Sequence, residues 1–179
     1  MKIIAPILTF LLLLSGCSGI PYETNKSNAQ IAEDLKISEN GIKVISKCNY
    51  YPFTYGIKAY AKMRSCVFVE NDKNIYVVNY DSNTKAYFSA FNLKLEEVNC
   101  AAIAKEGPGK GIVYLYTDQN AFTIALLHQN NDMNHEAVRK LTNELVKNSI
   151  PILDLSISIA NPLYKYKTSA GSACPITTR

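Results

Sequence analysis

The stretch SCVFVENDKNIYVVNY, residues 65–80, decides how this chain folds. Cys66–Val69 and Ile75–Tyr80 are rich in the β-branched and aromatic residues that strands favour. Between them, Glu70–Asn74 is polar and contains the Asn and Asp residues that turns favour. The stretch therefore predicts two antiparallel strands joined by a short turn.

A second stretch, Gly111–Leu127, repeats this pattern. Ile112–Tyr116 and Phe122–Leu127 are apolar, and Asp118–Asn120 connects them as a tight turn. Further strand-like segments begin at Ile42, and turn residues recur at a spacing that suits an antiparallel sheet closed into a barrel or sandwich.

One strong helix is expected after these strands. Asn134 is a suitable N-cap, and Met133 with Val138 has the spacing of a hydrophobic staple. The helix would have an apolar face formed by Val138, Leu141 and Leu145. It would also have an ion pair at i,i+4 spacing between Glu136 and Lys140. The helix should end before Pro151. A shorter helix near 28–36 is expected behind a capping box at Ser27–Gln30.

The fold class expected is α+β and mostly antiparallel β, with about seven strands as a small barrel or sandwich closed by one C-terminal amphipathic helix. No repeat or linker divides the chain, so residues 27–179 should form a single domain, with a last strand-like run at Ile152–Ile159. The order of strands followed by one helix over about 42–148 resembles the pleckstrin-homology-type barrel, including bacterial PH-like and GRAM-like domains. This resemblance is one of topology, without a residue-specific motif.

The N-terminus carries a targeting signal. Lys2 precedes the apolar run Ile3–Leu14, which is shorter than the roughly 20 residues that a spanning helix needs. The sequence LSGC at residues 14–17 resembles the lipobox of bacterial lipoproteins. This resemblance implies a signal peptide over 1–16, lipidation of Cys17 and attachment to a membrane through N-terminal acyl chains.

Residues 17–26 are then expected to be a tether. By the same resemblance, Ser18 after the lipidated cysteine implies the periplasmic face of the outer membrane, if the cell is Gram-negative. The formal net charge is +4, with 19 basic and 15 acidic side chains scattered along the chain, so nucleic acid is not an expected partner.

Four cysteines remain after Cys17, namely Cys48, Cys66, Cys100 and Cys174. An even number in an exported chain predicts two disulfides, for which three connectivities exist. If 42–48 pairs with 65–70, then Cys48 and Cys66 lie opposite each other, which favours Cys48–Cys66 and leaves Cys100–Cys174. A metal site is the rival interpretation, but no Cys-x-x-Cys or Cys/His cluster supports it.

The sequence contains no recognisable catalytic set. His128 and His135 are expected at a strand end and a helix start, and two histidines at this spacing do not make a zinc site. Glu106–Gly111 is rich in glycine but precedes a strand, whereas a phosphate-binding loop precedes a helix. The adjacent Glu96 and Glu97 are expected in a solvated turn or edge. We therefore expect no cofactor and no metal.

An aromatic cluster is the best candidate for a binding surface. Tyr50, Tyr51, Phe53 and Tyr55 fall in a predicted loop, and tyrosine supplies apolar area with a polar group. The alternative is that these rings cap one end of the barrel.

Two classes of function remain. The first is a non-enzymatic, membrane-anchored envelope lipoprotein that binds a protein partner or an envelope component. The alternative is a periplasmic hydrolase or inhibitor-type domain tethered to the membrane, which would need a deep polar pocket with a histidine beside a carboxylate. A lipid carrier would need a large apolar cavity.

Overall fold

The computed structural model describes residues 20–54, 63–104 and 110–155. Two helices, two short 3-10 helices and eight strands occur in these ranges. In chain order they are α1 (Asn25–Leu35), η1 (Glu39–Gly41), β1 (Ile42–Thr54), β2 (Arg64–Asn71), β3 (Asn74–Asp81), β4 (Ala86–Lys94), η2 (Leu95–Glu97), β5 (Cys100–Ala104), β6 (Val113–Tyr116), β7 (Asn120–Leu127), α2 (His135–Lys147) and β8 (Ile152–Leu155).

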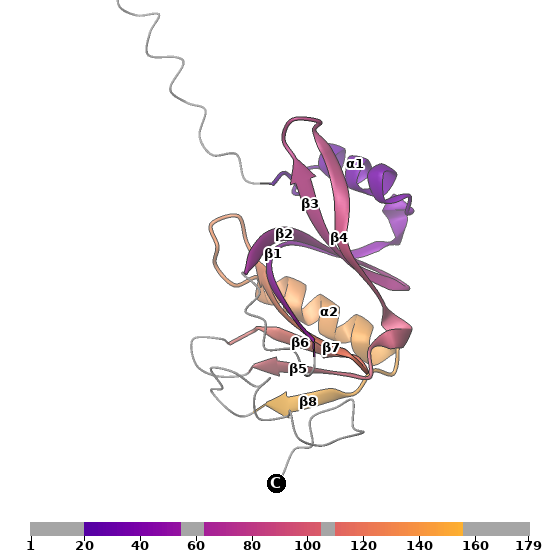
Figure 1. Ribbon diagram of the computed structural model, residues 1–179, viewed down its shortest axis with the longest axis vertical. Helices are drawn as coiled ribbons and strands as arrows, with labels where there is room; N and C mark the ends of the chain where they lie inside the picture. The colour runs from indigo at the N-terminus through magenta and orange to yellow at the C-terminus, as the bar shows by residue number, and fades with distance from the viewer. Residues whose placement is uncertain (1–19, 55–62, 105–109, 156–179) are drawn as a thin grey trace, which may run out of the picture.

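All eight strands form one sheet in the order β4-β3-β2-β1-β7-β6-β5-β8. The neighbours from β4 to β5 are antiparallel, and β8 adds to β5 in parallel after α2. The sheet curves around α2, with β3 and β4 on one side of the helix and β5 and β8 on the other (Figure 1). The expected seven antiparallel strands followed by one amphipathic helix are confirmed, but the sheet is not closed: within the described ranges β4 and β8 are its two edges.

The main core lies between the inner face of the sheet and α2. Alternate residues of each strand point into it, as the period of two requires. Its fully buried members include Phe68, Ile75, Leu115, Ile124, Leu126, Leu141 and Leu145. Because Leu141 and Leu145 come from the apolar face of α2, burial of this face holds the helix inside the curved sheet.

Helix α2 begins as predicted. The side chain of Asn134 accepts a hydrogen bond from the Ala137 amide at 3.0 Å. Met133 and Val138 both pack against the main core, and Lys140 Nζ lies 2.9 Å from Glu136 Oε1. The cap and the ion pair read from the sequence are present, and both residues of the predicted staple pack against the same core.

Helix α1 covers the outer face of β2–β4, where it buries Ile31 among Val67, Val69 and Tyr76. The predicted capping box is wrong by one turn. Thr24 is the N-cap, its hydroxyl accepts from the Ser27 amide at 3.0 Å, and the Ser27 hydroxyl accepts from the Thr24 amide at 3.1 Å. Ser27 is therefore the second member of the box rather than the first.

Residues 21–26, which the prediction assigned to a tether, contact the domain or belong to it. Tyr22 is only 5% exposed and belongs to the cluster beneath α1. The Tyr87 hydroxyl donates to the Pro21 carbonyl at 2.7 Å, so the chain is already held by the domain at Pro21. Burial of one aromatic ring outweighs the polar character of its neighbours, which is why the composition of 18–26 misled the prediction.

Strand β1 is longer than the sequence indicates, because it continues through Tyr50 to Thr54, where a loop was expected. It pairs with β2 in a register that sets Cys48 opposite Cys66, with their Cα atoms 4.9 Å apart. A disulfide joins the two, which is the pairing favoured from the sequence.

The turn before β6 depends on one glycine. Gly111 has φ +91°, and a Cβ atom added there would lie 2.9 Å from Met133 Cγ. Both the backbone conformation and the space beside Met133 therefore require glycine at this position. Within the described ranges, no helix is long and apolar enough to cross a membrane.

Candidate functional site

Among the described residues, the first residues of β1 pair with a neighbouring strand on one side only. β2 pairs with β1 from Ile42 to Tyr50, whereas β7 pairs with it only from Lys47 to Thr54. Among the described residues, no strand therefore pairs with Ile42–Ser46 on the β7 side. The register also shifts between Ile42 and Val44, which marks a β-bulge at Lys43.

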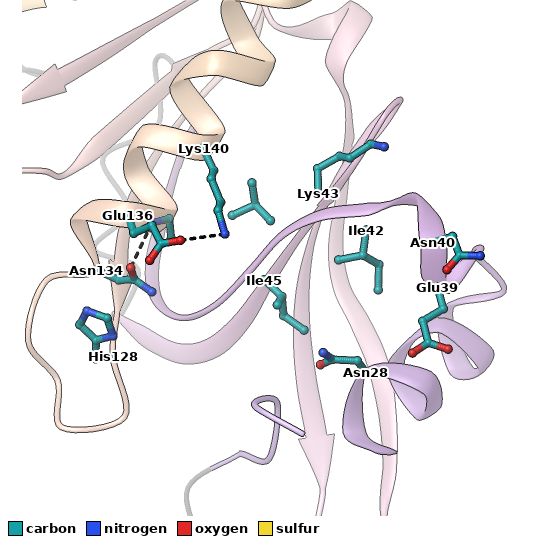
Figure 2. A pocket seen from close by; sticks show the side chains of 12 residues that line it. Asn28, Glu39, Asn40, Ile42, Lys43, Ile45, His128, Asn134, Glu136 and Lys140 are labelled. Atoms are coloured by element: carbon teal, nitrogen blue, oxygen red, sulfur yellow. Dashed lines mark hydrogen bonds and ion pairs between the residues drawn. The ribbon is translucent and has the colours of Figure 1, made fainter. Parts of the chain in front are cut away.

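A cleft of about 380 Å³ lies along this edge. Figure 2 shows Asn28, Glu39 and Asn40 on one side of it, His128, Asn134, Glu136 and Lys140 on the other, and β1 between them. The first wall comes from α1 and η1, and the second from the end of β7 and the first turns of α2. Ile42, Lys43, Val44, Ile45 and Ala137 complete the lining.

The cleft follows the edge of the sheet rather than one of its faces. Val44 is buried in the main core, while Ile45 packs against the cluster beneath α1 on the opposite face. Side chains from both faces border the same cleft, which is possible only where the strand has no neighbour. The cleft therefore combines a strand edge with two helical walls.

The charged groups of the cleft are mostly paired and solvated. The hydrogen bond from Lys140 and its positive charge hold the pKa of Glu136 below its usual range. Lys43 Nζ lies 3.6 Å from Asp72 Oδ1, just outside the cleft. Glu39 is exposed, and no ion pair holds it among the described residues. Glu39 is therefore the charge in the cleft that remains available to a partner.

This arrangement suits binding better than acid–base catalysis. His128 and Glu136 border the same cleft, but both are exposed. A general acid or base usually has a pKa moved toward neutrality by burial, whereas the pKa of Glu136 is moved away from it. Among the described residues, His128 and Glu136 lie in an open cleft rather than in the deep polar pocket that the hydrolase alternative needs.

The two histidines and the Glu96–Glu97 pair come from different elements. His128 follows the end of β7 and His135 is the first residue of α2, as expected. Glu96 and Glu97 are exposed in η2, which agrees with a solvated turn. Among the described residues, no group of three His, Cys, Asp or Glu side chains could hold a metal ion.

Two of the four residues of the predicted aromatic surface, Tyr50 and Tyr51, lie on opposite faces of β1. Tyr50 is 6% exposed and belongs to the main core, and Tyr51 points to the other face of β1, toward a smaller cluster on β5 and β6. The backbone of Phe53 belongs to β1, while its side chain and all of Tyr55 lie outside the described part of the structure. Tyr50 is therefore a core residue, because the strand continues through it and alternation turns it inward.

Of the other three cysteines, only Cys100 lies within the described residues. Cys100 is fully buried in β5 and is disulfide-bonded. Cys174 and the lipidation candidate Cys17 lie outside the described residues, so the pairing Cys100–Cys174 and the lipidation of Cys17 stay predictions.

Sequence reasoning missed a buried carboxyl group, that of Glu70. This residue ends the inward-pointing series of β2, opposite Val44 on β1 and Ile75 on β3, and it is 0% exposed. Neither carboxyl oxygen has a hydrogen-bond partner in the described structure. Burial, with the negative charges of Glu144 and Asp72, raises the pKa of Glu70 to about 8. The only sequence signal for the burial of Glu70 was its position two residues after Phe68, which puts both side chains on the same face of the strand.

Comparison with known proteins gives a likeness of fold only. No protein-family model matches the sequence, and no curated protein matches it in sequence. The apo structure of the activated truncation of Vav1 is similar with a TM-score of 0.47 and 9% identity, over 69% of this chain and 32% of that chain. The Slm1-PH domain in complex with inositol-4-phosphate is similar with a TM-score of 0.40 and 10% identity, over 56% and 91%.

The hSac2 domain from human phosphoinositide phosphatase Sac2 has a TM-score of 0.41 and 11% identity, over 76% of this chain and 93% of that one. This chain spans 26% of the structure of Vav1 with an allosteric inhibitor and 32% of two other Vav1 structures. The fold class stated here, a curved sheet of seven antiparallel strands followed by one amphipathic helix, rests on the strand order and not on these similarities.

Proposed function

We propose that this chain is a lipid-anchored protein of the bacterial cell envelope whose domain binds a protein partner or an envelope component and catalyses no reaction. The sequence LSGC at residues 14–17 carries the proposal, because it follows a charged start and an apolar run too short to span a membrane. Acyl chains on Cys17 would hold the domain at a membrane, at the periplasmic face of the outer membrane in a Gram-negative cell.

The disulfide Cys48–Cys66 supports this location. Both cysteines are fully buried in the main core, and such bonds persist in oxidising compartments rather than in the cytosol. A lipobox and a structural disulfide are two independent features of an exported protein.

The cleft supports a binding role. It exposes a strand edge and charged side chains, but its carboxylate and histidine lack the burial that tunes catalytic groups. The hydrolase alternative therefore has less support than a binding module.

Three measurements test the proposal, the first of them on native protein purified from membranes. Intact mass spectrometry should give the mass of residues 17–179 plus acyl chains, and a Cys17→Ser variant should move from the membrane fraction to the soluble fraction. An unacylated protein that starts at another residue would contradict the anchor. Chemical cross-linking in intact cells, followed by mass spectrometry, should then capture the same partner repeatedly; failure to capture any protein or glycan contradicts the binding role.

A further inference from the structure

We propose that the unpaired edge of β1 at Ile42–Ser46 is a docking site for an extended segment of a partner polypeptide, which adds to the sheet as a short strand between α1 and α2. The inference rests on the proposed binding function and names its partner class. Adding a strand to an exposed sheet edge is a general mode of peptide recognition, in which backbone hydrogen bonds supply affinity and side-chain pockets supply specificity.

The backbone of β1 presents hydrogen-bonding groups to the cleft. In a strand, the N–H and C=O groups of successive residues point to opposite neighbouring strands. The Asn134 N–H donates to the Leu126 carbonyl at 2.9 Å, so the backbone groups of Leu126 point away from β1 and those of Leu127 point toward it. Leu127 pairs with Lys47, so the N–H and C=O groups of Lys47 point toward β7. Ile45, two residues earlier, presents its N–H and C=O groups to the same side, where β7 does not extend, and these groups therefore point into the cleft.

The shape of the cleft favours a single extended chain. The edge from Ile42 to Ser46 spans roughly 13 Å, enough for four or five residues of a partner strand. It lies in a recess with helical elements on both sides (Figure 2). A folded sheet, including the β1 edge of a second copy of this chain, would meet these walls before it reached the backbone of Ile45. A flexible segment would not.

The charges of the cleft add a requirement on the partner. Glu39 projects from η1 without an ion pair among the described residues, whereas Glu136 on the opposite wall is already held by Lys140. Charge complementarity then requires a Lys or Arg side chain where the partner passes Glu39. The partner segment is extended and basic on the side facing η1.

A peptide selection tests the inference on the full chain in detergent. Random 12-residue peptides displayed on phage are selected against the immobilised protein, and the selected peptides are measured by fluorescence anisotropy. We expect peptides that carry a Lys or Arg, and we expect Glu39→Lys to weaken their binding about 5-fold. The matched control is Glu33→Lys, an exposed residue of α1 outside the cleft, which should leave the affinity unchanged.

Hydrogen–deuterium exchange provides the second measurement. A bound peptide should slow exchange in the segment 43–46 and in the first turn of α2. Protection confined to another part of the surface, equal loss of affinity in both charge variants, or a selection that returns no peptide would each overturn the docking site. If the cross-linked envelope partner is still captured in that case, the binding function stands and only this site is wrong; if neither assay finds a partner, both are wrong.

Discussion

Replacing Glu70 with Gln removes the buried ionisable group at the end of β2 and keeps nearly the same shape. The Glu70 carboxyl is 0% exposed, it has no hydrogen-bond partner in the described structure, and its pKa is about 8, raised chiefly by burial. Glu144 and Asp72 raise this pKa further, while Lys43 and Lys147 lower it. At neutral pH the folded protein therefore keeps Glu70 mostly protonated.

This raised pKa makes folding stability depend on pH with a definite sign. In the unfolded chain the carboxyl titrates near its ordinary value of 4.5, so between pH 4.5 and 8 the unfolded state releases a proton that the folded state retains. The favourable contribution of the protonated group is fully present below pH 4.5 and is lost as the pH rises to 8. At about 1.4 kcal/mol per pH unit, the free energy of unfolding should fall by about 3 kcal/mol between pH 5 and pH 8.

In the Glu70→Gln variant this pH-dependent loss should disappear. The chain has no Trp, so unfolding in urea is best followed by circular dichroism at pH 5, 6, 7 and 8. We expect the two proteins to have similar stability at pH 5, where both side chains are neutral, and the variant to be more stable by about 3 kcal/mol at pH 8. A Glu70→Met variant, which also removes the unpaired polar atoms, should be more stable than the natural chain throughout this range.

The comparison between variants isolates Glu70 from other titrating groups. Glu136 and Asp81 have lowered pKa values, so they act in the opposite direction at lower pH, and they are unchanged in the variant. The exposed Glu97 in η2 provides a matched control, and Glu97→Gln should leave the pH dependence as it is. Parallel stability curves for the natural chain and Glu70→Gln would refute the reasoning, because the carboxyl would then titrate alike in both states.

Three further substitutions test the fold, each read from the urea midpoint at pH 6. Replacing Cys48 and Cys66 together by Ala should cost about 3 kcal/mol, because the disulfide closes a loop between residues 18 apart in sequence; an unchanged midpoint would contradict a constraining role for the bond. Asn134→Ala should cost about 1 to 2 kcal/mol, since it removes the cap of α2, and intact α2 stability would show that the cap is dispensable. Gly111→Ala should cost about 1 to 3 kcal/mol because of its positive φ and the lack of space for a methyl group. Gly41→Ala, where an added Cβ would make an ordinary contact 3.7 Å from Ser38 Cβ, should stay within about 0.5 kcal/mol.

Local patterns explain most of what the sequence predicted of the fold. The stretch 65–80 forms β2 and β3, and its side chains alternate between the two faces of the sheet, both of which are covered. Helix α2 has its cap, staple and apolar face within fifteen residues of chain, so its start could be read directly. Strands and helices whose signals are local are the ones that sequence reasoning finds.

The candidate site could not be found in this way. The cleft exists because β7 ends opposite Lys47 while β1 begins at Ile42, and this stagger depends on pairing between strands far apart in sequence. Tyr50 appeared to be a loop residue because Pro52 and Gly56 follow it, although the strand continues to Thr54. Glu70 looked like the first residue of a polar turn, and only the register with Val44 reveals that it points inward.

The attachment of the chain at Pro21 and Tyr22 has a geometric consequence for the proposed anchored form. Cys17 and Pro21 are four residues apart, and a fully extended chain spans at most about 14 Å over that distance. A tether extending to residue 26 would have allowed more than twice this reach. In the proposed anchored form, the domain would thus be confined to a thin layer next to the bilayer surface, with little freedom to tumble. Partners in the same membrane would meet the domain at high effective concentration, whereas partners elsewhere in the compartment would have to diffuse to that membrane surface.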